Sequence, residues 1–200
     1  MDPAMHYFAQ AALAALFLLA PSFATSQPSS IDAPVVVLQP HPAQPDWAKI
    51  CPKAAARNNC YVTRDFVDAS GQAFLAIGIY TFPDNANRII GRALLPLGLS
   101  LPEGARVAVD DHEAIAGRFS SCVQTGCIAD FEIAPAQMKA LLAGSTIRIA
   151  ALNQYKAEIG FIAPLGGFSS ALEGPPLSET VLAFRQQNMR DALQKAQSRQ

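Results

Sequence analysis

The chain has 200 residues, of which 50% are hydrophobic and 16% are charged, and its formal net charge is −1 at pH 7. This length suits one packed domain with extensions, and the charged fraction is below the roughly 25% usual for soluble domains. Proteins that bind nucleic acid neutralise phosphates with a basic surface, so the near-neutral balance argues against nucleic acid as a partner.

Residues 1–24 have the pattern of a secretory signal peptide. Residues 11–20 read AALAALFLLA, an apolar run about half as long as the roughly twenty residues that a membrane-spanning helix needs. Ser22-Phe23-Ala24 then supplies small residues for cleavage after Ala24. Residues 1–10 contain no Lys or Arg, so an uncleaved membrane anchor is the alternative, and only in that case do we expect membrane contact. We therefore expect a periplasmic or secreted protein of the bacterial cell envelope.

Residues 25–46 are expected to form a proline-rich tether. Proline lacks the backbone N–H that a strand donates, and it favours an extended, semi-rigid chain. The prolines of this segment are Pro28, Pro34, Pro40, Pro42 and Pro45. The apolar patch 34–38 within it is a candidate edge strand, so the whole segment is not expected to lack structure.

From Trp47 onward the pattern changes to short strands separated by Gly, Pro, Asn and Asp. The expected strands are 47–51, 60–67, 74–82, 88–95, 106–110, 115–119, 127–133, 146–152 and 158–164. Regularly spaced short strands without alternating helices are typical of an all-β fold. We predict a single small β-sandwich or β-barrel domain over residues 47–174.

Two helices are expected beside these strands. Residues 135–143 have proline in the first turn, and Gly144 follows the last turn, which is the usual asymmetry of helix ends. Residues 178–200 begin with capping residues after a double proline, so we predict a C-terminal helical extension over 175–200.

The C-terminal helix is the element that we expect to bind a partner. Its apolar residues recur at roughly helical spacing, and a small domain has limited surface with which to cover them. The residues predicted to contact the partner are Leu182, Arg185, Met189 and Leu193. The alternative is that this helix packs on its own domain.

The four cysteines indicate disulfide bonds. An even number of cysteines behind a signal peptide is typical of exported, disulfide-bonded proteins. Of the three possible pairings, sequence locality favours Cys51 with Cys60 and Cys122 with Cys127, and the other two stay open. Zinc is disfavoured because eight residues separate Cys51 from Cys60, where structural sites usually have two to four. A redox role is disfavoured because no C-x-x-C motif occurs.

Candidate catalytic groups are few. His112 lies in the acidic run 110–113, which we expect to be a solvated polar turn between two strands. Asp130 and Glu132 would share one face of a strand, as a glycosidase pair could, but surface strand charges explain them equally well. We therefore predict that the protein is not an enzyme, and we expect neither a cofactor nor a metal site.

Four segments form a recognisable set when taken together. They are Trp47 to Cys51 with Cys60-Tyr61, residues 95–104 (LPLGLSLPEG), residues 118–127 (RFSSCVQTGC) and residues 167–172 (GFSSAL). In this order they resemble the invasion-associated locus B family of small secreted or periplasmic α-proteobacterial proteins. The resemblance implies a compact β domain with cysteine bridges, and it supplies no catalytic residues. The family takes its name from a role of pathogenic members in host-cell invasion.

Three residues of these segments have physical interpretations of their own. Trp47 and Phe168 are expected to be large core anchors at the two ends of the domain. Arg118 is expected to form an ion pair within the domain rather than to bind a carboxylate of a ligand.

The function that we favour from the sequence is a protein-interaction module of the envelope. Its partner would be another envelope protein or a host-surface protein. The alternative is a periplasmic carrier of a small ligand or lipid, for which an apolar cavity inside the barrel would be the sign. An envelope hydrolase is less well supported, because the sequence offers no convincing active site.

Overall fold

The computed structural model describes residues 34–52, 59–83 and 88–197. The predicted signal peptide, 1–24, and the first part of the predicted tether lie outside these residues. So do the last three residues of the predicted C-terminal helix.

Strands dominate the structure, and most lie where the sequence pattern predicts them. They are β1 (Val35–Val37), β2 (Gln39–Pro40), β3 (Ala48–Ile50), β4 (Tyr61–Val67), β5 (Ala73–Phe82), β6 (Arg88–Leu95), β7 (Ala105–Val109), β8 (Ile115–Val123), β9 (Gly126–Glu132), β10 (Thr146–Leu152) and β11 (Glu158–Pro164). The helices are α1 (Pro135–Ala143), α2 (Phe168–Glu173) and α3 (Glu179–Gln197), and a 3-10 turn, η1, spans Leu101–Glu103.

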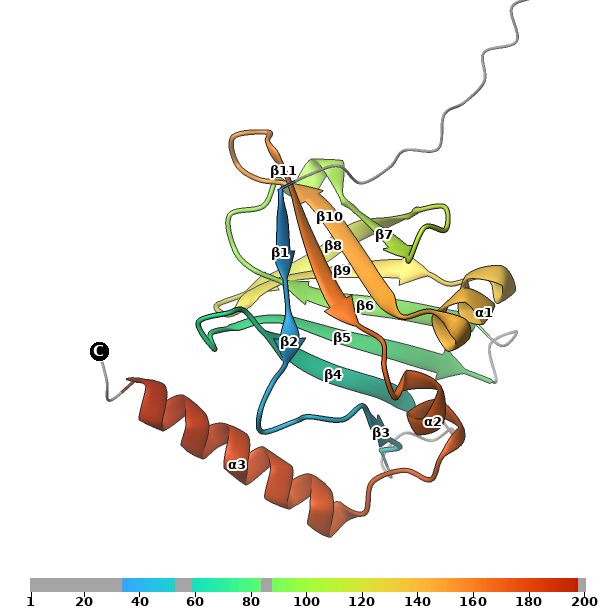
Figure 1. The fold of residues 1–200 in the computed structure, drawn as a ribbon, viewed down its shortest axis with the longest axis vertical. Helices are drawn as coiled ribbons and strands as arrows, with labels where there is room; N and C mark the ends of the chain where they lie inside the picture. Colours follow the sequence, from blue (N-terminus) through green and yellow to red (C-terminus); the bar gives the residue numbers. More distant parts are fainter. Residues whose placement is uncertain (1–33, 53–58, 84–87, 198–200) are drawn as a thin grey trace, which may run out of the picture.

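All eleven strands belong to one sheet that curls into a nearly closed barrel (Figure 1). The strand order is β1-β11-β10-β7-β8-β9-β6-β5-β4-β2, with β3 paired beside β2 on β4. In the part of the chain that the structure describes, every strand pairing is antiparallel except that of β1 with β11. The prediction of an all-β sandwich or barrel is confirmed.

A single segment, residues 35–40, bridges the two edges of this sheet. Its first half, β1, pairs in parallel with β11, and its second half, β2, pairs antiparallel with β4. Between them, the Leu38 N–H donates to the carbonyl of Ile162 at 2.8 Å. The exposed edges of a curled sheet are thereby covered by one strand of the same chain.

Leu38 anchors the bridging segment in the core. Its side chain is only 2% exposed, whereas that of its neighbour Val37 is 66% exposed. Alternation of this kind is the period-two pattern of a strand with one face on the core. The edge strand expected within the predicted tether therefore forms, and it packs on the barrel before the predicted start of the domain at Trp47.

Three aromatic rings, which we call the aromatic seal, pack where the two ends of the domain meet. The Trp47 ring lies edge-on to Phe66 with centroids 5.9 Å apart, and edge-on to Phe168 at 5.2 Å. Such edge-to-face pairs add to the free energy gained by burying the rings. Trp47 and Phe168 are both buried, as expected for core anchors.

The aromatic seal also accommodates a buried cation. The Arg64 guanidinium lies 6.0 Å from the Trp47 ring centre and 5.8 Å from that of Phe66. It donates from Nη1 to the Gly166 carbonyl at 3.1 Å. Burial lowers the pKa of Arg64, with Asp46 acting in the opposite direction. The ring faces and the carbonyl partly replace the water that the cation loses.

Two short helices pack at one end of the barrel, where the sequence predicts only one. Helix α1 begins with Pro135, and the Gly144 N–H closes its last turn on the Ala140 carbonyl at 2.7 Å. Helix α2, which the sequence pattern does not predict, is held at its C-terminal end by Lys49, whose Nζ donates to the carbonyls of Leu172 and Gly174.

Helix α3 runs away from α2 along the outside of the barrel (Figure 1). Its start is fixed to β3, because the Leu177 N–H donates to the Lys49 carbonyl at 2.8 Å. The first turn is capped by Ser178, whose hydroxyl accepts from the Val181 N–H at 3.3 Å. The C-terminal helical extension is therefore present within the described residues.

Both disulfide bonds join residues that are close in sequence. Cys51 is bonded to Cys60, and Cys122 is bonded to Cys127, so the pairing that locality favours is confirmed and the two alternatives are excluded. The first joins the ends of the loop between β3 and β4, and the second joins directly opposed residues of β8 and β9. Disulfides of this kind form in oxidising compartments.

The contribution of the bridging segment to stability can be tested by truncating the side chain of Leu38. We expect Leu38→Ala to lower the free energy of unfolding by about 2–5 kcal/mol, because it leaves a cavity in the core. The control Val37→Ala, on the exposed side of the same strand, should cost less than about 1 kcal/mol. Guanidinium unfolding of the oxidised protein measures both, and equal small losses would mean that residues 35–40 do not hold the barrel.

Candidate functional site

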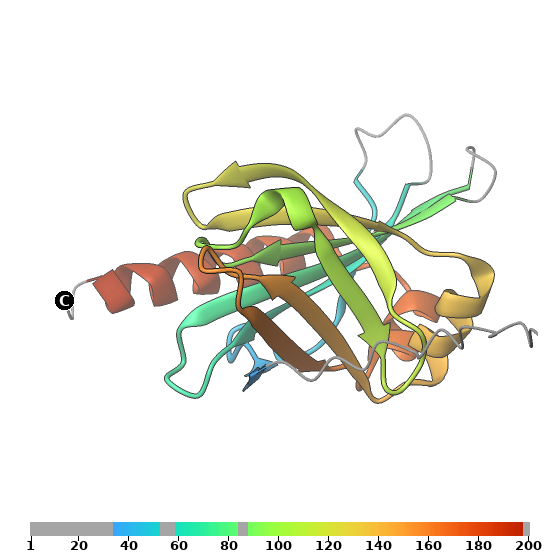
Figure 2. The same ribbon diagram turned by 90° about the horizontal axis from the view of Figure 1, so that it is seen from above.

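The candidate site is formed by three neighbouring connections at the end of the barrel away from α1. They are residues 96–104 between β6 and β7, the turn 124–125 between β8 and β9, and residues 153–157 between β10 and β11. Figure 2 shows these connections together at the left, with α1 at the right. We call this surface the loop end.

The first connection is built from turn residues that hold it close to the sheet. Gly98 and Gly104 have positive φ angles of 90° and 69°, which glycine adopts without steric cost. A Cβ on Gly104 would lie 2.3 Å from the Gly117 carbonyl oxygen, so only glycine fits where η1 meets β8. The sequence pattern LPLGLSLPEG thus encodes one fixed loop.

Backbone hydrogen bonds tie the first connection to the third. The Gln154 N–H donates to the Gly98 carbonyl at 2.8 Å, and the Ser100 N–H donates to the Leu152 carbonyl at 2.7 Å. The Asn153 carboxamide oxygen accepts from the N–H groups of Tyr155 and Ala157 at 2.9 and 3.0 Å. This is an Asx turn, in which the side chain replaces a backbone acceptor and fixes the loop shape.

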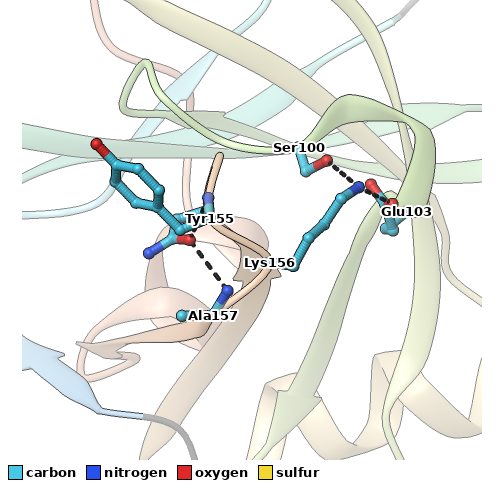
Figure 3. A network of polar contacts seen from close by, with 6 residues as sticks. Ser100, Glu103, Tyr155, Lys156 and Ala157 are labelled. Atoms are coloured by element: carbon cyan, nitrogen blue, oxygen red, sulfur yellow. Dashed lines mark hydrogen bonds and ion pairs between the residues drawn. The ribbon is translucent and has the colours of Figure 1, made fainter.

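An ion pair links the same two connections (Figure 3). Lys156 donates from Nζ to the Ser100 hydroxyl at 2.9 Å and to the Glu103 carboxylate. Hydrogen bonding to Lys156 is the main cause that lowers the pKa of the Glu103 carboxyl from 4.5 to about 2, and a hydrogen bond between Ser100 and Glu103 is the next cause. The carboxyl group therefore stays ionised, and the ion pair intact, at every physiological pH.

The second connection is held by a disulfide and by close packing. Cys122 and Cys127 face each other across β8 and β9, one residue pair from the turn. Gly126 packs so closely on β6 that a Cβ there would lie 2.2 Å from the Leu95 carbonyl oxygen. All three connections therefore have internal restraints.

Large apolar side chains project from these restrained loops. Tyr155 is 80% exposed and Leu97 is 57% exposed, although large side chains of this kind are usually mostly buried. Leu101 and Val123 are also exposed. Figure 3 shows the Tyr155 ring pointing away from the Lys156 ion pair. Apolar side chains gathered on a surface mark interaction sites more often than scattered ones do.

The residues that the sequence predicted for partner binding lie on α3, away from the loop-end residues. Leu182 and Arg185 are only half-buried, and the side chains of Met189 and Leu193 lie outside the described part of the structure. Among the described side chains of α3, the most exposed large apolar residue is Phe184, at 65%, which the predicted set leaves out. The contact of Leu182, Arg185, Met189 and Leu193 with a partner stays a prediction.

Asp130 and Glu132 take part in surface ion pairs. Asp130 accepts from Arg92 at 2.7 Å, and Glu132 pairs with Arg88. Hydrogen bonding to Arg92 is the main cause that lowers the pKa of Asp130. Arg118 stands opposite Asp130 in the strand register, but its side chain is exposed and Asp130 binds Arg92 instead.

His112 lies in an exposed turn, as the sequence pattern predicts. Its Nδ1 is 3.0 Å from the Val109 carbonyl oxygen. The nearby Asp110 carboxylate accepts from the N–H groups of Ser145 and Thr146, and these hydrogen bonds lower its pKa. The acidic run thus fastens the turn after β7 to the start of β10.

Within residues 34–52, 59–83 and 88–197, no three side chains of His, Cys, Asp or Glu lie close enough to share a metal ion. No helix in the same part of the chain is both long and apolar enough to cross a membrane.

The family model described as "Invasion associated locus B (IalB) protein" matches residues 47–176. Two similar curated proteins are invasion protein B homologues of Brucella abortus, from strain 2308 and from biovar 1 strain 9-941. Each is 27% identical over 130 residues, which is 64% of this chain and 74% of theirs. The match to the family model includes the whole loop end, whereas the bridging segment and α3 lie outside it.

A solved structure supports the same fold. The crystal structure of invasion associated protein B from Bartonella henselae has a TM-score of 0.56 and 23% sequence identity. The match covers 63% of this chain and 88% of the Bartonella chain.

The Lys156–Glu103 ion pair, which restrains the loop end, can be tested by measuring the pKa of the Glu103 carboxyl. We expect Lys156→Met to raise the pKa of the Glu103 carboxyl from about 2 to above about 3, because its main hydrogen-bond donor is removed. In the wild type the interaction is complete above pH 4.5 and is lost only as the pH falls through about 2. Carboxyl-detected NMR titration measures both values.

The control for this titration is Lys139→Met, which removes an exposed lysine from α1 at the other end of the barrel. It should leave the Glu103 titration unchanged. A wild-type pKa near 4.5, or no difference between Lys156→Met and wild type, would show that the ion pair does not form.

Proposed function

Because the chain belongs to the invasion-associated locus B family, we propose that it is an exported, non-catalytic protein of the bacterial cell envelope that binds another protein through its loop end. The partner is an envelope protein or a host-surface protein with a complementary apolar surface.

Export is supported by two independent features of the chain. The first is the signal-peptide pattern of residues 1–24, and the second is the pair of disulfide bonds, which require an oxidising compartment. We infer that the periplasm or the extracellular space is where the protein acts.

A non-catalytic role is supported by the structural roles of the acidic side chains. Asp130 and Glu132, which the sequence offered for acid–base chemistry, form ion pairs with Arg92 and Arg88. Asp110, in the same acidic run as His112, binds backbone N–H groups. Catalytic residues, in contrast, converge on a position where a substrate atom can lie.

The exposure of Tyr155 and Leu97 on restrained loops is the observation that carries the proposal. Tyrosine is frequent among the residues that contribute most to binding free energy in protein interfaces. Loops that are already fixed lose little conformational entropy on binding, so more of the contact energy appears as affinity. The Asx turn, the Lys156–Glu103 ion pair and the Cys122–Cys127 disulfide supply this preorganisation.

The names of the Brucella proteins connect the fold with invasion. A protein that acts in invasion through a binding surface would display that surface on the shared domain. The loop end lies within the matched residues 47–176, whereas α3 lies beyond them. We therefore assign the partner to the loop end and give α3 no essential part in the contact.

In-cell crosslinking tests this assignment. The tagged wild type is compared with the double variant Leu97→Glu/Tyr155→Ser, with Leu142→Glu on α1 as the matched control, and with a chain truncated before Ser178. We expect a defined partner that the wild type, the control and the truncated chain capture. The double variant should lose at least about 90% of the capture, because removing two central interface residues costs more than 1.4 kcal/mol.

Loss of the partner on truncation alone would assign the contact to α3 instead. Loss in none of the variants would contradict a role for either surface. Circular dichroism of the double variant checks its fold, which should be unchanged because both side chains are exposed.

A further inference from the structure

The barrel holds a cavity of about 200 Å³ at the end opposite the loop end. Its walls are inward-facing side chains of β5, β6, β7, β9 and β10, and α1 lies over it. The buried part of the lining is apolar, with residues such as Ile79, Phe131 and Ile149. This cavity takes no part in the protein-binding role proposed above.

Small side chains create the space. Ala93 in β6 and Ala140 in α1 both line the cavity and are 1% and 8% exposed. Larger residues at these two positions would occupy the same volume. Protein interiors are packed to the density of organic crystals, so a cavity of this size leaves its walls without many contacts that an occupant would restore.

The cavity opens to solvent beside α1. The exposed residues of the lining are Arg92 in β6, His112 and Glu113 in the turn after β7, and Ala136 in the first turn of α1. A molecule can therefore enter between this turn and the helix. The turn is held to β10 by Asp110, which accepts from the Thr146 N–H at 2.8 Å and from its hydroxyl at 2.9 Å.

The lining also limits the charge of an occupant. Arg92 contributes to the wall, but its guanidinium is bound to Asp130 and lies 5.4 Å from the centre of the Tyr80 ring. His112 and Glu113 stay at the mouth, in contact with water. Gln137 also lines the cavity, and its buried Oε1 has no hydrogen-bond partner. A charged group inside the cavity would lose its hydration, and this neutral acceptor would not supply an opposite charge in return.

We propose that this cavity binds a compact, uncharged apolar molecule of about one ring with a short substituent. An apolar cavity of about 150 Å³ in another protein stays dry and accepts benzene, so about 200 Å³ accommodates a somewhat larger molecule of the same kind. The site rests on the barrel alone, and its occupant is independent of any protein bound at the loop end.

Toluene is the probe that tests the site, and benzoate is its charged counterpart of similar shape. The oxidised chain, labelled at isoleucine methyl groups, is titrated with each and followed by NMR. We expect toluene to give saturable shifts at Ile79, Ile147 and Ile149, which line the cavity. Benzoate should bind at least about tenfold more weakly, because its carboxylate would be desolvated.

Two variants change the cavity itself. Ala140→Leu fills it from α1 and should weaken toluene binding at least about tenfold while keeping or raising the melting temperature, as cavity-filling changes do. Ala136→Leu narrows the mouth at an exposed position and should also weaken binding. The matched control Ala143→Leu makes the same change on the exposed side of the same helix and should bind toluene as the wild type does.

The proposal is overturned if toluene gives no saturable shift in the folded wild type. It is also overturned if folded Ala140→Leu binds toluene as tightly as Ala143→Leu, or if benzoate binds as tightly as toluene. None of these results depends on the crosslinking experiment, so the two proposals fail separately.

Discussion

Closure of the sheet by residues 35–40 is the constraint on which the rest of the structure depends. One strand pairs with β11 through its first half and with β4 through its second, and Leu38 between them is buried. Without this segment both edges would be open, the core beneath Leu38 would meet water, and an exposed edge would invite pairing with other chains. The aromatic seal then joins the start of the matched domain to α2, where Phe168 packs on Trp47.

A closed barrel gives two ends with different properties. At one end, turns with required glycines, an ion pair and a disulfide fix three loops that display apolar side chains to solvent. At the other, α1 covers a cavity that small side chains leave in the core. The strands between them are hydrogen-bonded into one continuous sheet, so the two surfaces are held on one frame. Binding at either end needs no rearrangement of the barrel.

The sequence predicted most of the strands from Tyr61 to Pro164, because they are apolar or alternating runs and many are bounded by Gly, Pro, Asn or Asp. It also predicted the disulfide pairing, since locality and hairpin geometry agree here. The bridging strand is harder to predict, because prolines dominate the composition around the apolar patch 34–38. Its role depends on long-range pairing with β11 and β4, which local composition does not encode.

The candidate site was harder to predict from the sequence. Leu97 and Tyr155 are apolar residues of the kind that usually lie in a core, and only the loop geometry shows that they face solvent. Helix α2 was missed because its six residues are too few for a periodic pattern. The α3 residues Leu182 and Arg185 were chosen on helical spacing, which cannot show that Phe184 is the more exposed side chain.

Amide hydrogen exchange at Leu38 and His41 tests the closed barrel most directly. The Leu38 N–H donates to the Ile162 carbonyl at one edge of the sheet, and the His41 N–H donates to the Asp65 carbonyl at the other. The account predicts that both amides are protected to an extent comparable with those of β10 in the barrel wall. Exchange of both at the rate of an unstructured peptide, with β10 still protected, would show that the barrel is open and would contradict it.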